Sequence, residues 1–345
     1  MYCIALSSHS HFSIILRNSH HVIFDCRSAK DFIFWNLETE RMVKFLPKLW
    51  WIFASLLSVS SSRSKDILVD DSLFQKIESH ENRTTWNIDW NYQRNLTKTQ
   101  FQSKLGVHFD FRKDAPDMRP SFIGSSMFNS LPESFDARQK WPKCAGIISS
   151  VTDQGGCSSC WAVAATSAMS DRLCIHSVNH TIQERVSAQD LLACCTECGN
   201  GCFGGLPGAA WYHWHSSGIV TGGDYGSNEG CQPYSLKPCS SHLDYLTCPE
   251  VFQTPTCQKR CHWTSSTKRD YEDAKTYGNK PYLLPRNENE IMYEIFQNGP
   301  AEAGFEVYQD FALYKNGIYS HLIGEMIGTC IIQVFDGLAS ISFLF

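Results

Sequence analysis

The chain has 345 residues, long enough for one large domain or two of ordinary size. Its 30 Lys and Arg against 35 Asp and Glu give a formal net charge of −5. This balance argues against nucleic acid as the main partner, because phosphate binding needs a basic surface. No stretch approaches roughly 18 uninterrupted apolar residues, so the sequence predicts no membrane span.

The first predicted element is a secretory signal at residues 42–62. A basic start is followed by the apolar run 49–59 and by small residues that suit a cleavage site. A buried core helix is the alternative for this run. The upstream segment 1–41 has no clear periodicity and stays unassigned. Translation from Met42 would account for it, whereas a start at Met1 would leave the signal internal.

Residues 63–130 contain no cysteine, although the following segment is dense with them. Three N-x-Thr sequons begin at Asn82, Asn95 and Asn179, and behind an export signal they are candidate glycosylation sites. The change in cysteine content near Leu131 predicts a removable or separately packed segment, followed by a disulfide-linked body.

Two helices are predicted early in the body. The first begins near Cys160, because apolar residues recur at helical spacing through Leu173. This stripe consists of Trp161, Ala164, Ala165, Ala168, Met169 and Leu173. The second begins at Ser187, with Asp190 three residues later in a capping pattern.

A third helix and a strand are predicted near the end of the chain. The helix starts at Asn287 and stops at Gly299-Pro300. Its expected buried residues are Ile291, Met292, Ile295 and Phe296. Alternation at Ala303, Phe305 and Val307 predicts the strand.

Cysteine usage points to an oxidising compartment and to one free thiol. The chain has 16 cysteines, and thirteen of them lie between Cys144 and Cys261. An exported chain commonly carries so many, whereas a cytosolic enzyme rarely does. Because thirteen is odd, complete pairing within this cluster would still leave one thiol over.

The central motif is the nine-residue stretch 153–161, Asp-Gln-Gly-Gly-Cys-Ser-Ser-Cys-Trp. A thiol at the first turn of a helix, as expected for Cys160, is stabilised as thiolate by backbone N–H groups and the helix dipole. The Gln154 amide and the Cys160 N–H could then donate to the oxyanion formed when the thiolate attacks a carbonyl. The alternative is that Cys157 and Cys160 are disulfide members or a redox C-x-x-C pair.

These residues resemble the papain-like cysteine peptidases of cathepsin B type. The resemblance covers about residues 70–329. The matching stretches are residues 83–86, 131–138, 157–161, 194–205, 298–300 and 324–326. It implies an α+β fold with a helical left domain, a β-barrel right domain and an active site in the cleft between them. Because similarity ends after Gly328, the right domain is expected to be incomplete.

The resemblance also implies roles for individual segments and residues. Residues 63–130 would be an inhibitory propeptide, 131–329 the peptidase domain and 330–345 a divergent tail. Cys160 would be the nucleophile and Gln154 the oxyanion donor. The implied substrate-binding residues are Gly204, Gly205 and His242. The implied disulfides are Cys144–Cys174, Cys157–Cys202, Cys194–Cys257, Cys195–Cys198, Cys231–Cys261 and Cys239–Cys248, which leave Cys160 free.

One expected part of the catalytic machinery is not found in the sequence. Where the family has its catalytic histidine, this chain has Cys330, and nothing resembles the family's Asn-Ser-Trp segment. His321 matches a different histidine of the family. The chain is therefore expected to lack the catalytic His and Asn.

Two hypotheses follow for function. The first is a cysteine peptidase zymogen that hydrolyses peptide bonds through an acyl-enzyme on Cys160, in the secretory pathway and then a lysosomal or extracellular location. Its partners would be peptide or protein substrates, its own propeptide and cystatin-like inhibitors, without nucleic acid. The second is a non-catalytic homologue that binds peptide or inhibitor.

Two further alternatives concern the cysteines. A secreted disulfide-rich structural module is a weaker alternative for the whole chain. A zinc site at Cys195, Cys198 and Cys202 competes with their disulfides, but no His-rich second half follows. No cofactor and no metal is predicted.

Overall fold

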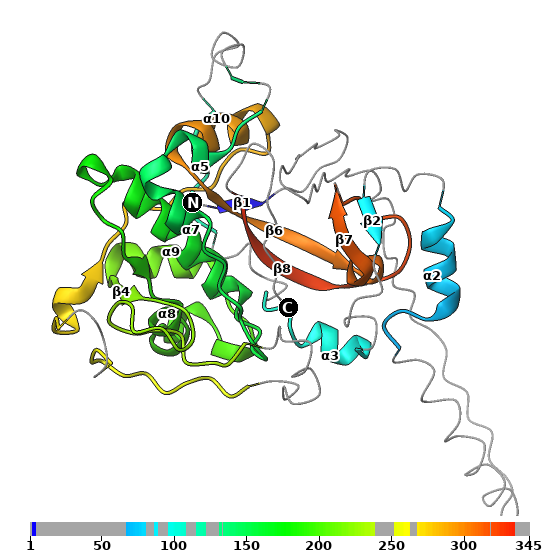
Figure 1. Ribbon diagram of the computed structural model, residues 1–345, viewed down its shortest axis with the longest axis horizontal. Helices are drawn as coiled ribbons and strands as arrows, with labels where there is room; N and C mark the ends of the chain where they lie inside the picture. Colours follow the sequence, from blue (N-terminus) through cyan, green and yellow to red (C-terminus); the bar gives the residue numbers. More distant parts are fainter. Residues whose placement is uncertain are drawn as a thin grey trace, which may run out of the picture.

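The computed structural model describes residues 2–4, 67–80, 86–88, 96–107, 115–121, 131–132, 134–238, 252–262, 268–317 and 319–334. The predicted signal at 42–62 lies outside these residues. Within them the elements form a mainly helical lobe and a lobe built on long strands (Figure 1). None of the described helices combines the length and apolar character needed to cross a membrane.

The helical lobe is arranged around one long helix. Its helices are α5 (Ala137–Lys140), α6 (Ala145–Ile148), α7 (Cys160–His176), α8 (Ala188–Cys194) and α9 (Pro207–Ser216). A small antiparallel sheet, in the order β3-β4-β5, consists of β3 (Arg185–Val186), β4 (Ile219–Gly222) and β5 (Lys275–Thr276). Short 3-10 turns connect these elements, at Pro142–Cys144, Val178–His180, Thr196–Cys198, Gly201–Phe203 and Glu272–Ala274.

The strand lobe centres on β6 (Ala301–Tyr308), which runs antiparallel to β8 (Met326–Val334) and parallel to β1 (Tyr2–Ile4). After the 3-10 turn Gln309–Leu313, β7 (Tyr314–Gly317) pairs antiparallel with β2 (Trp86–Ile88). Helix α10 (Glu288–Asn298) leads into β6. The described strands do not close into a barrel. The α+β class predicted from the sequence is confirmed.

The predicted helices are present, and local sequence explains their ends. Helix α7 begins at Cys160, as expected, and its many alanines allow it to be buried on nearly every side. In α8 the Ser187 side chain accepts a hydrogen bond from the Asp190 N–H, and in α10 Asn287 does the same for Glu290. Gly299 ends α10, as expected.

The burial predicted for α10 is partly wrong. Ile295 is buried, but Ile291, Met292 and Phe296 are only half-buried. The residues buried beside Ile295 are Glu290 and Glu294. These carboxylates are stable there because Arg119 and Arg172 form ion pairs with them. A hydrophobic pattern does not predict such paired charges.

Residues that precede position 131 form part of the core of the strand lobe. Helices α2 (Asp71–Glu78) and α3 (Lys98–Gln102) each bury apolar side chains, among them Phe74 and Phe101. Trp86 is 2% exposed, and its indole N–H donates to the Ser320 carbonyl at 3.1 Å. The N-terminal segment is therefore packed onto the body rather than separate from it.

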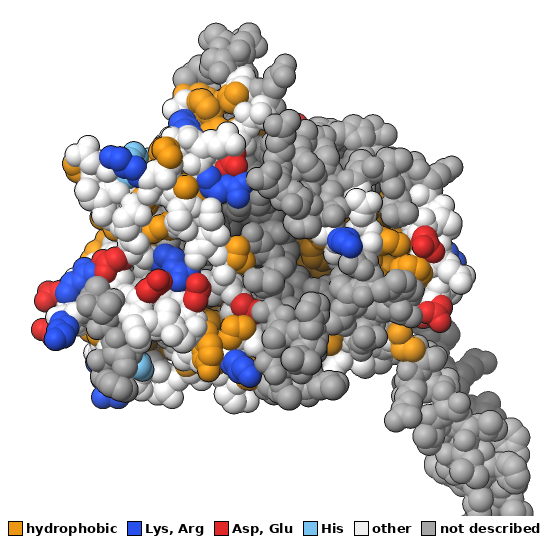
Figure 2. Space-filling model, in the orientation of Figure 1, with side chains coloured by type: hydrophobic (Ala, Val, Ile, Leu, Met, Phe, Trp, Pro, Cys, Tyr) orange, Lys and Arg blue, Asp and Glu red, His pale blue; other side chains and the backbone are white. Residues whose placement is uncertain are grey.

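The visible face of the described surface carries Lys, Arg, Asp and Glu side chains close to one another, with no field of a single sign (Figure 2). Such mixing agrees with the modest net charge of −5.

Candidate active site

Cys160 is the first residue of α7, at the side of the helical lobe that meets β8. Hydrogen bonds to Tyr234 and one disulfide hold the loop that precedes Cys160. The Tyr234 hydroxyl donates to the Gln154 carbonyl at 3.0 Å and lies 2.8 Å from the Ser159 hydroxyl. Since the Tyr234 proton is used, its oxygen accepts the proton of Ser159. The Cys157–Cys202 disulfide ties the same loop to the chain beyond α8.

The residue Cys160 is 4% exposed, and its sulfur accepts hydrogen bonds from the backbone. The backbone N–H of Gly106 donates to Sγ at 3.3 Å and that of Ile331 at 3.4 Å. The Cys330 thiol and the Trp161 backbone N–H also help to lower the pKa of Cys160. Burial raises the pKa of the Cys160 thiol, but these donors stabilise the thiolate more, so the pKa is lowered overall.

The pKa of Cys330 is shifted in the opposite direction, to a higher value. It lies on β8 opposite Phe305 of β6 and is fully buried. Burial, its hydrogen bond to Cys160 and the charge of the Cys160 thiolate raise its pKa well above the ordinary value. The two thiols therefore form an asymmetric pair, in which Cys160 gives up its proton more easily and Cys330 keeps its own.

Gln154 also faces the segment that covers Cys160. Its Nε2 donates to the Lys104 carbonyl at 2.9 Å, and the Ser158 hydroxyl donates to the Ser103 carbonyl. A side-chain amide that hydrogen-bonds a peptide carbonyl beside a nucleophilic sulfur is the arrangement needed to stabilise an oxyanion.

The predicted glycines lie beside the segment that covers Cys160. The Gly205 N–H donates to the Gly106 carbonyl at 2.9 Å, and Val107 forms a parallel bridge with Gly205. A Cβ on Gly205 would lie 2.4 Å from the Trp161 ring, so only glycine fits there. Gly204 is next to it, and its carbonyl accepts from the Asn200 N–H. Gly205 therefore pairs through its backbone with the same segment, 106–107, that contacts the Cys160 sulfur.

The structure contains five of the six disulfides that the resemblance implies. They are Cys144–Cys174, Cys157–Cys202, Cys194–Cys257, Cys195–Cys198 and Cys231–Cys261. Cys239 and Cys248 lie outside the described residues. Among the described cysteines, Cys160 and Cys330 are free.

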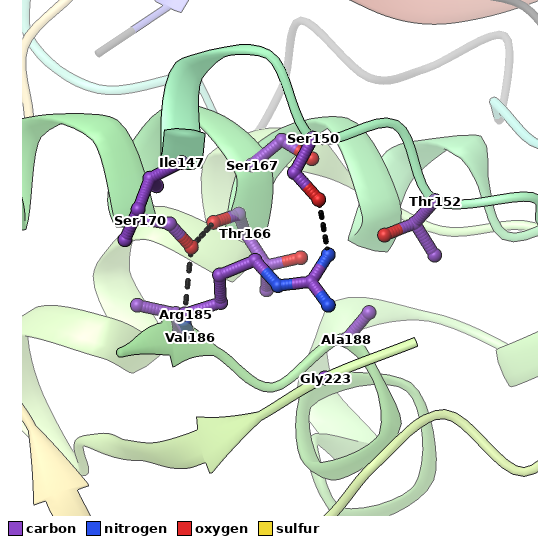
Figure 3. Close-up of a pocket in the computed structure, with 10 residues that line it drawn as sticks. All are labelled: Ile147, Ser150, Thr152, Thr166, Ser167, Ser170, Arg185, Val186, Ala188 and Gly223. Carbon is purple, nitrogen blue, oxygen red and sulfur yellow. Dashed lines mark hydrogen bonds between the residues drawn. The ribbon is translucent and has the colours of Figure 1, made fainter. Parts of the chain in front are cut away.

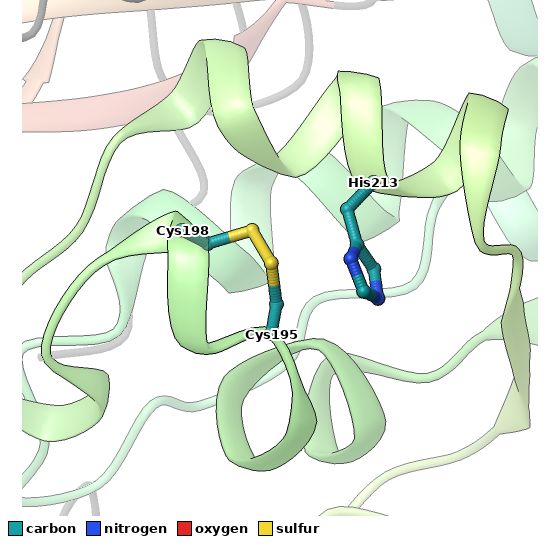
Figure 4. A group of neighbouring side chains, drawn as sticks. All are labelled: Cys195, Cys198 and His213. Atoms are coloured by element: carbon teal, nitrogen blue, oxygen red, sulfur yellow. A yellow bond between two sulfur atoms is a disulfide. The ribbon is translucent and has the colours of Figure 1, made fainter.

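The sulfurs of the alternative zinc site are bonded to other sulfurs. Cys195 is joined to Cys198, with His213 beside them, and Cys202 is joined to Cys157 (Figure 4). His213 Nδ1 lies 2.7 Å from Glu197 Oε1. A disulfide sulfur is not the thiolate that zinc binds, so this site is a covalent link in the oxidised protein.

Among the remaining predicted site residues, Asn179 belongs to the part of the chain that the structure describes. His242, Asn82 and Asn95 lie outside the described residues, and Asn179 is exposed in a 3-10 turn. His321 Nδ1 lies 3.1 Å from the buried Asp310 carboxylate. Within the described residues, no imidazole is among the hydrogen-bond donors to the Cys160 sulfur.

Two buried groups near Cys160 were missed by sequence reasoning. The position of Cys330 was noted, but its contact with Cys160 was not predicted, because the contact depends on β8 crossing to the other lobe. Glu302 is 1% exposed on β6 and accepts from the Trp211 indole. Burial raises the pKa of Glu302 to about 8, and the nearby Cys160 charge adds to this rise. No sequence signal distinguishes Glu302 from an ordinary surface glutamate.

A pocket beside β3 does not contain any residue that contacts Cys160. The Arg185 side chain crosses it and donates to the Ser150 hydroxyl at 2.5 Å (Figure 3). The Ser170 hydroxyl accepts from the Val186 N–H and donates to the Thr166 carbonyl. Because the polar groups that line this pocket hydrogen-bond to one another, we interpret the pocket as part of the internal packing of the helical lobe and not as a binding site.

Residues 131–333 match the papain family of cysteine proteases. The chain belongs to this family. It is 42% identical over 230 residues to a cathepsin B-like cysteine proteinase of Schistosoma japonicum, covering 65% of this chain and 66% of that protein. It is 44% identical over 202 residues to cathepsin B-like cysteine proteinase 6 of Caenorhabditis elegans, covering 57% of this chain and 52% of that protein. Each match spans less than two thirds of the relative.

Solved structures agree with this assignment. Procathepsin B S9 from Trypanosoma congolense is 32% identical, with a TM-score of 0.64 over 78% of this chain and 83% of that chain. A recombinant stem bromelain precursor is 19% identical, with a TM-score of 0.50 over 83% of this chain and 81% of that chain, and shows the fold alone. Membership in the papain family makes the chain a relative of hydrolases that use a cysteine.

Proposed function

We propose that the chain is a cathepsin B-like cysteine peptidase made as a zymogen, with Cys160 as nucleophile and Gln154 as oxyanion donor. The observation that carries this proposal is the thiolate-stabilising set of donors around Cys160, at the start of α7, next to a side-chain amide that binds a peptide carbonyl. The Cys160 sulfur attacks the carbonyl carbon, and the C–N bond breaks as the amine takes a proton from water. The resulting acyl-enzyme is then hydrolysed, which releases the acid and restores the Cys160 thiolate.

The segment 103–107 acts as the inhibitory part of a propeptide. It binds where a peptide would bind, since it contacts Gln154, Cys160 and Gly205 in succession. It gives the sulfur an N–H donor rather than a carbonyl carbon, and it pairs with Gly205 in parallel. The nucleophile is therefore covered without a bond placed for cleavage.

Proton transfer is the weak step of this peptidase. The Cys330 thiol interacts with the proposed nucleophile, but its raised pKa keeps its proton bound. A thiol of this kind is a poor acid and base near neutral pH. We therefore propose slow turnover for a site with Cys330. The second candidate function, a homologue that binds peptide without hydrolysis, is favoured by this same observation.

Export and modification follow from the same assignment. Five disulfides favour an oxidising compartment, and the exposed Asn179 begins a sequon. We propose a lysosomal or extracellular destination, peptide or protein substrates and cystatin-like inhibitors. His242 remains the proposed contact for a substrate carboxylate.

A labelling and turnover experiment tests the proposal on the full chain. The purified protein is treated with a thiol-alkylating peptide reagent and, separately, with a fluorogenic peptide amide. Labelling at Cys160 together with turnover that Cys160→Ser abolishes supports the peptidase. Labelling of Cys160 without turnover supports the binding homologue, provided that turnover is also absent in Gly106→Ala, in which the segment 103–107 is displaced. Absence of labelling in both forms contradicts both functions.

A further inference from the structure

Cys160 and Cys330 are free cysteines whose side chains the structure describes, and they lie close to each other. Both are buried, and both belong to the same apolar cluster between the lobes. The backbone N–H of Ile331, the residue after Cys330, donates to the Cys160 sulfur at 3.4 Å. The Cys330 thiol donates to the Ile331 carbonyl at 3.7 Å, and its interaction with Cys160 helps to lower the pKa of the Cys160 thiol. The nearby Cys157 sulfur is already bonded to Cys202, so it does not compete for either thiol.

The oxidant is implied by the rest of the molecule. Five disulfides require that the chain folds in a thiol–disulfide buffer. We propose that Cys160 and Cys330 form a dithiol–disulfide couple, closed by a low-molecular-weight disulfide of the glutathione class and reopened by the corresponding thiol. This property goes beyond peptide hydrolysis and does not depend on it.

The reaction has two exchange steps. The Cys160 thiolate attacks one sulfur of the small disulfide, whose S–S bond breaks, so that a mixed disulfide forms on Cys160 and one small thiolate leaves. That thiolate takes the proton of Cys330, whose sulfur then attacks the Cys160 sulfur and releases the second small thiolate, which is protonated by water. Two protein thiols are oxidised, and one small disulfide is reduced to two thiols.

The difference in pKa between the Cys160 and Cys330 thiols determines the order of the two exchange steps. The lowered pKa of Cys160 makes it the attacking group, and the raised pKa of Cys330 holds it protonated until the mixed disulfide has removed the neighbouring negative charge. The disulfide then blocks the nucleophile reversibly. Because the segment 103–107 covers Cys160, its displacement is expected to speed the first step.

Mass spectrometry of the full chain in glutathione buffers tests the couple. Protein is equilibrated at several ratios of oxidised to reduced glutathione, quenched in acid, alkylated and digested. We expect a cross-linked peptide containing Cys160 and Cys330, two hydrogen atoms lighter than the sum of its thiol peptides. The Cys144–Cys174 peptide stays linked in every buffer and serves as the internal reference.

The dependence on glutathione distinguishes this bond from a mixed disulfide. An internal disulfide releases two small thiols, so a tenfold drop in reduced glutathione at constant oxidised glutathione raises the oxidised-to-reduced ratio about 100-fold. A mixed disulfide releases one, so the same change raises the ratio about 10-fold. In Cys330→Ser we expect the 10-fold response and glutathione retained on Cys160.

Two results would overturn the proposal. One is a wild-type protein that retains glutathione on Cys160 with the 10-fold response. The other is a Cys160 that stays fully alkylated, in wild type and in Gly106→Ala, at the most oxidising ratio. Neither result depends on Cys330→Ser, so both decide the matter even where that variant does not fold. Loss of peptide hydrolysis would bear on the proposed peptidase and not on this couple.

Discussion

The backbone N–H of Gly106 donates a hydrogen bond to the sulfur of Cys160 across 3.3 Å, from a segment 54 residues earlier in the chain. This approach requires a glycine. A Cβ on Gly106 would lie 2.0 Å from the Ser158 carbonyl oxygen and 3.3 Å from the Cys160 sulfur itself. The close fit of this one residue thus covers the Cys160 sulfur.

Gly106→Ala is expected to displace the segment 103–107 from the Cys160 sulfur. Overpacking typically costs about 1–3 kcal/mol, and a tenfold change in an equilibrium corresponds to about 1.4 kcal/mol. We therefore expect alkylation of Cys160 by iodoacetamide to become roughly 5- to 150-fold faster. Mass spectrometry of the Cys160 peptide over time gives the rate.

Gly146→Ala is the matched control. A Cβ at Gly146 in α6 meets nothing within 4 Å, so this variant should keep the wild-type alkylation rate. Equal rates for Gly106→Ala and Gly146→Ala, in folded proteins, would show that the segment 103–107 does not cover Cys160.

Cys330→His is expected to increase peptide hydrolysis. An imidazole at this position would contact the Cys160 sulfur and transfer protons near neutral pH, an effect typically of about 10²–10⁴-fold. The measurement is the initial rate of cleavage of a fluorogenic peptide amide. Cys330→Ser is the control, because it removes the thiol without adding a base. A rate for Cys330→His no higher than that of Cys330→Ser would contradict the role given to this position.

Local patterns predicted much of the helical lobe, and long-range contacts explain what they missed. The stripe after Cys160 and the caps at Ser187 and Asn287 depend on neighbours in sequence, so they could be read directly. Gly106 stands in an ordinary Leu-Gly-Val stretch, and only the folded chain places it at the sulfur. The burial of Glu302 likewise depends on Trp211, 91 residues away.

Glu302→Gln is expected to flatten the pH dependence of stability. In the folded protein the pKa of Glu302 is raised to about 8, above its ordinary value of 4.5, so the folded state binds the proton more tightly than the unfolded state. Stability from this group is therefore full below pH 4.5 and is lost as pH rises towards 8, by up to about 1.4 kcal/mol per pH unit. Denaturant unfolding at several pH values measures this slope.

The side-chain oxygen of a glutamine can still accept the hydrogen bond from the Trp211 indole N–H, so we expect Glu302→Gln to fold. Glu306→Gln, at an exposed position of the same strand, is the control. A slope between pH 5 and 8 that is the same in wild type and Glu302→Gln would contradict the assigned protonation.

Arg119→Ala is expected to loosen the segment before residue 131. Arg119 forms ion pairs with Glu290 and Glu294, both buried, and its own N–H donates to the Leu283 carbonyl. Removing one partner of a buried pair typically costs about 3–5 kcal/mol. Arg172 still pairs with Glu294, so we expect the lower part of that range. Denaturant midpoints, with Arg138→Ala as a control for a local pair with Asp136, test this expectation. Equal losses in the two variants would contradict it.

The central claim is that Cys160 is an unbridged thiol made acidic by the donors around it. Its alkylation rate as a function of pH, followed on the Cys160 peptide of the protein kept in reduced glutathione, tests this claim most directly. The account predicts a midpoint clearly below the ordinary cysteine value of 9.0. A midpoint at or above that value would contradict it.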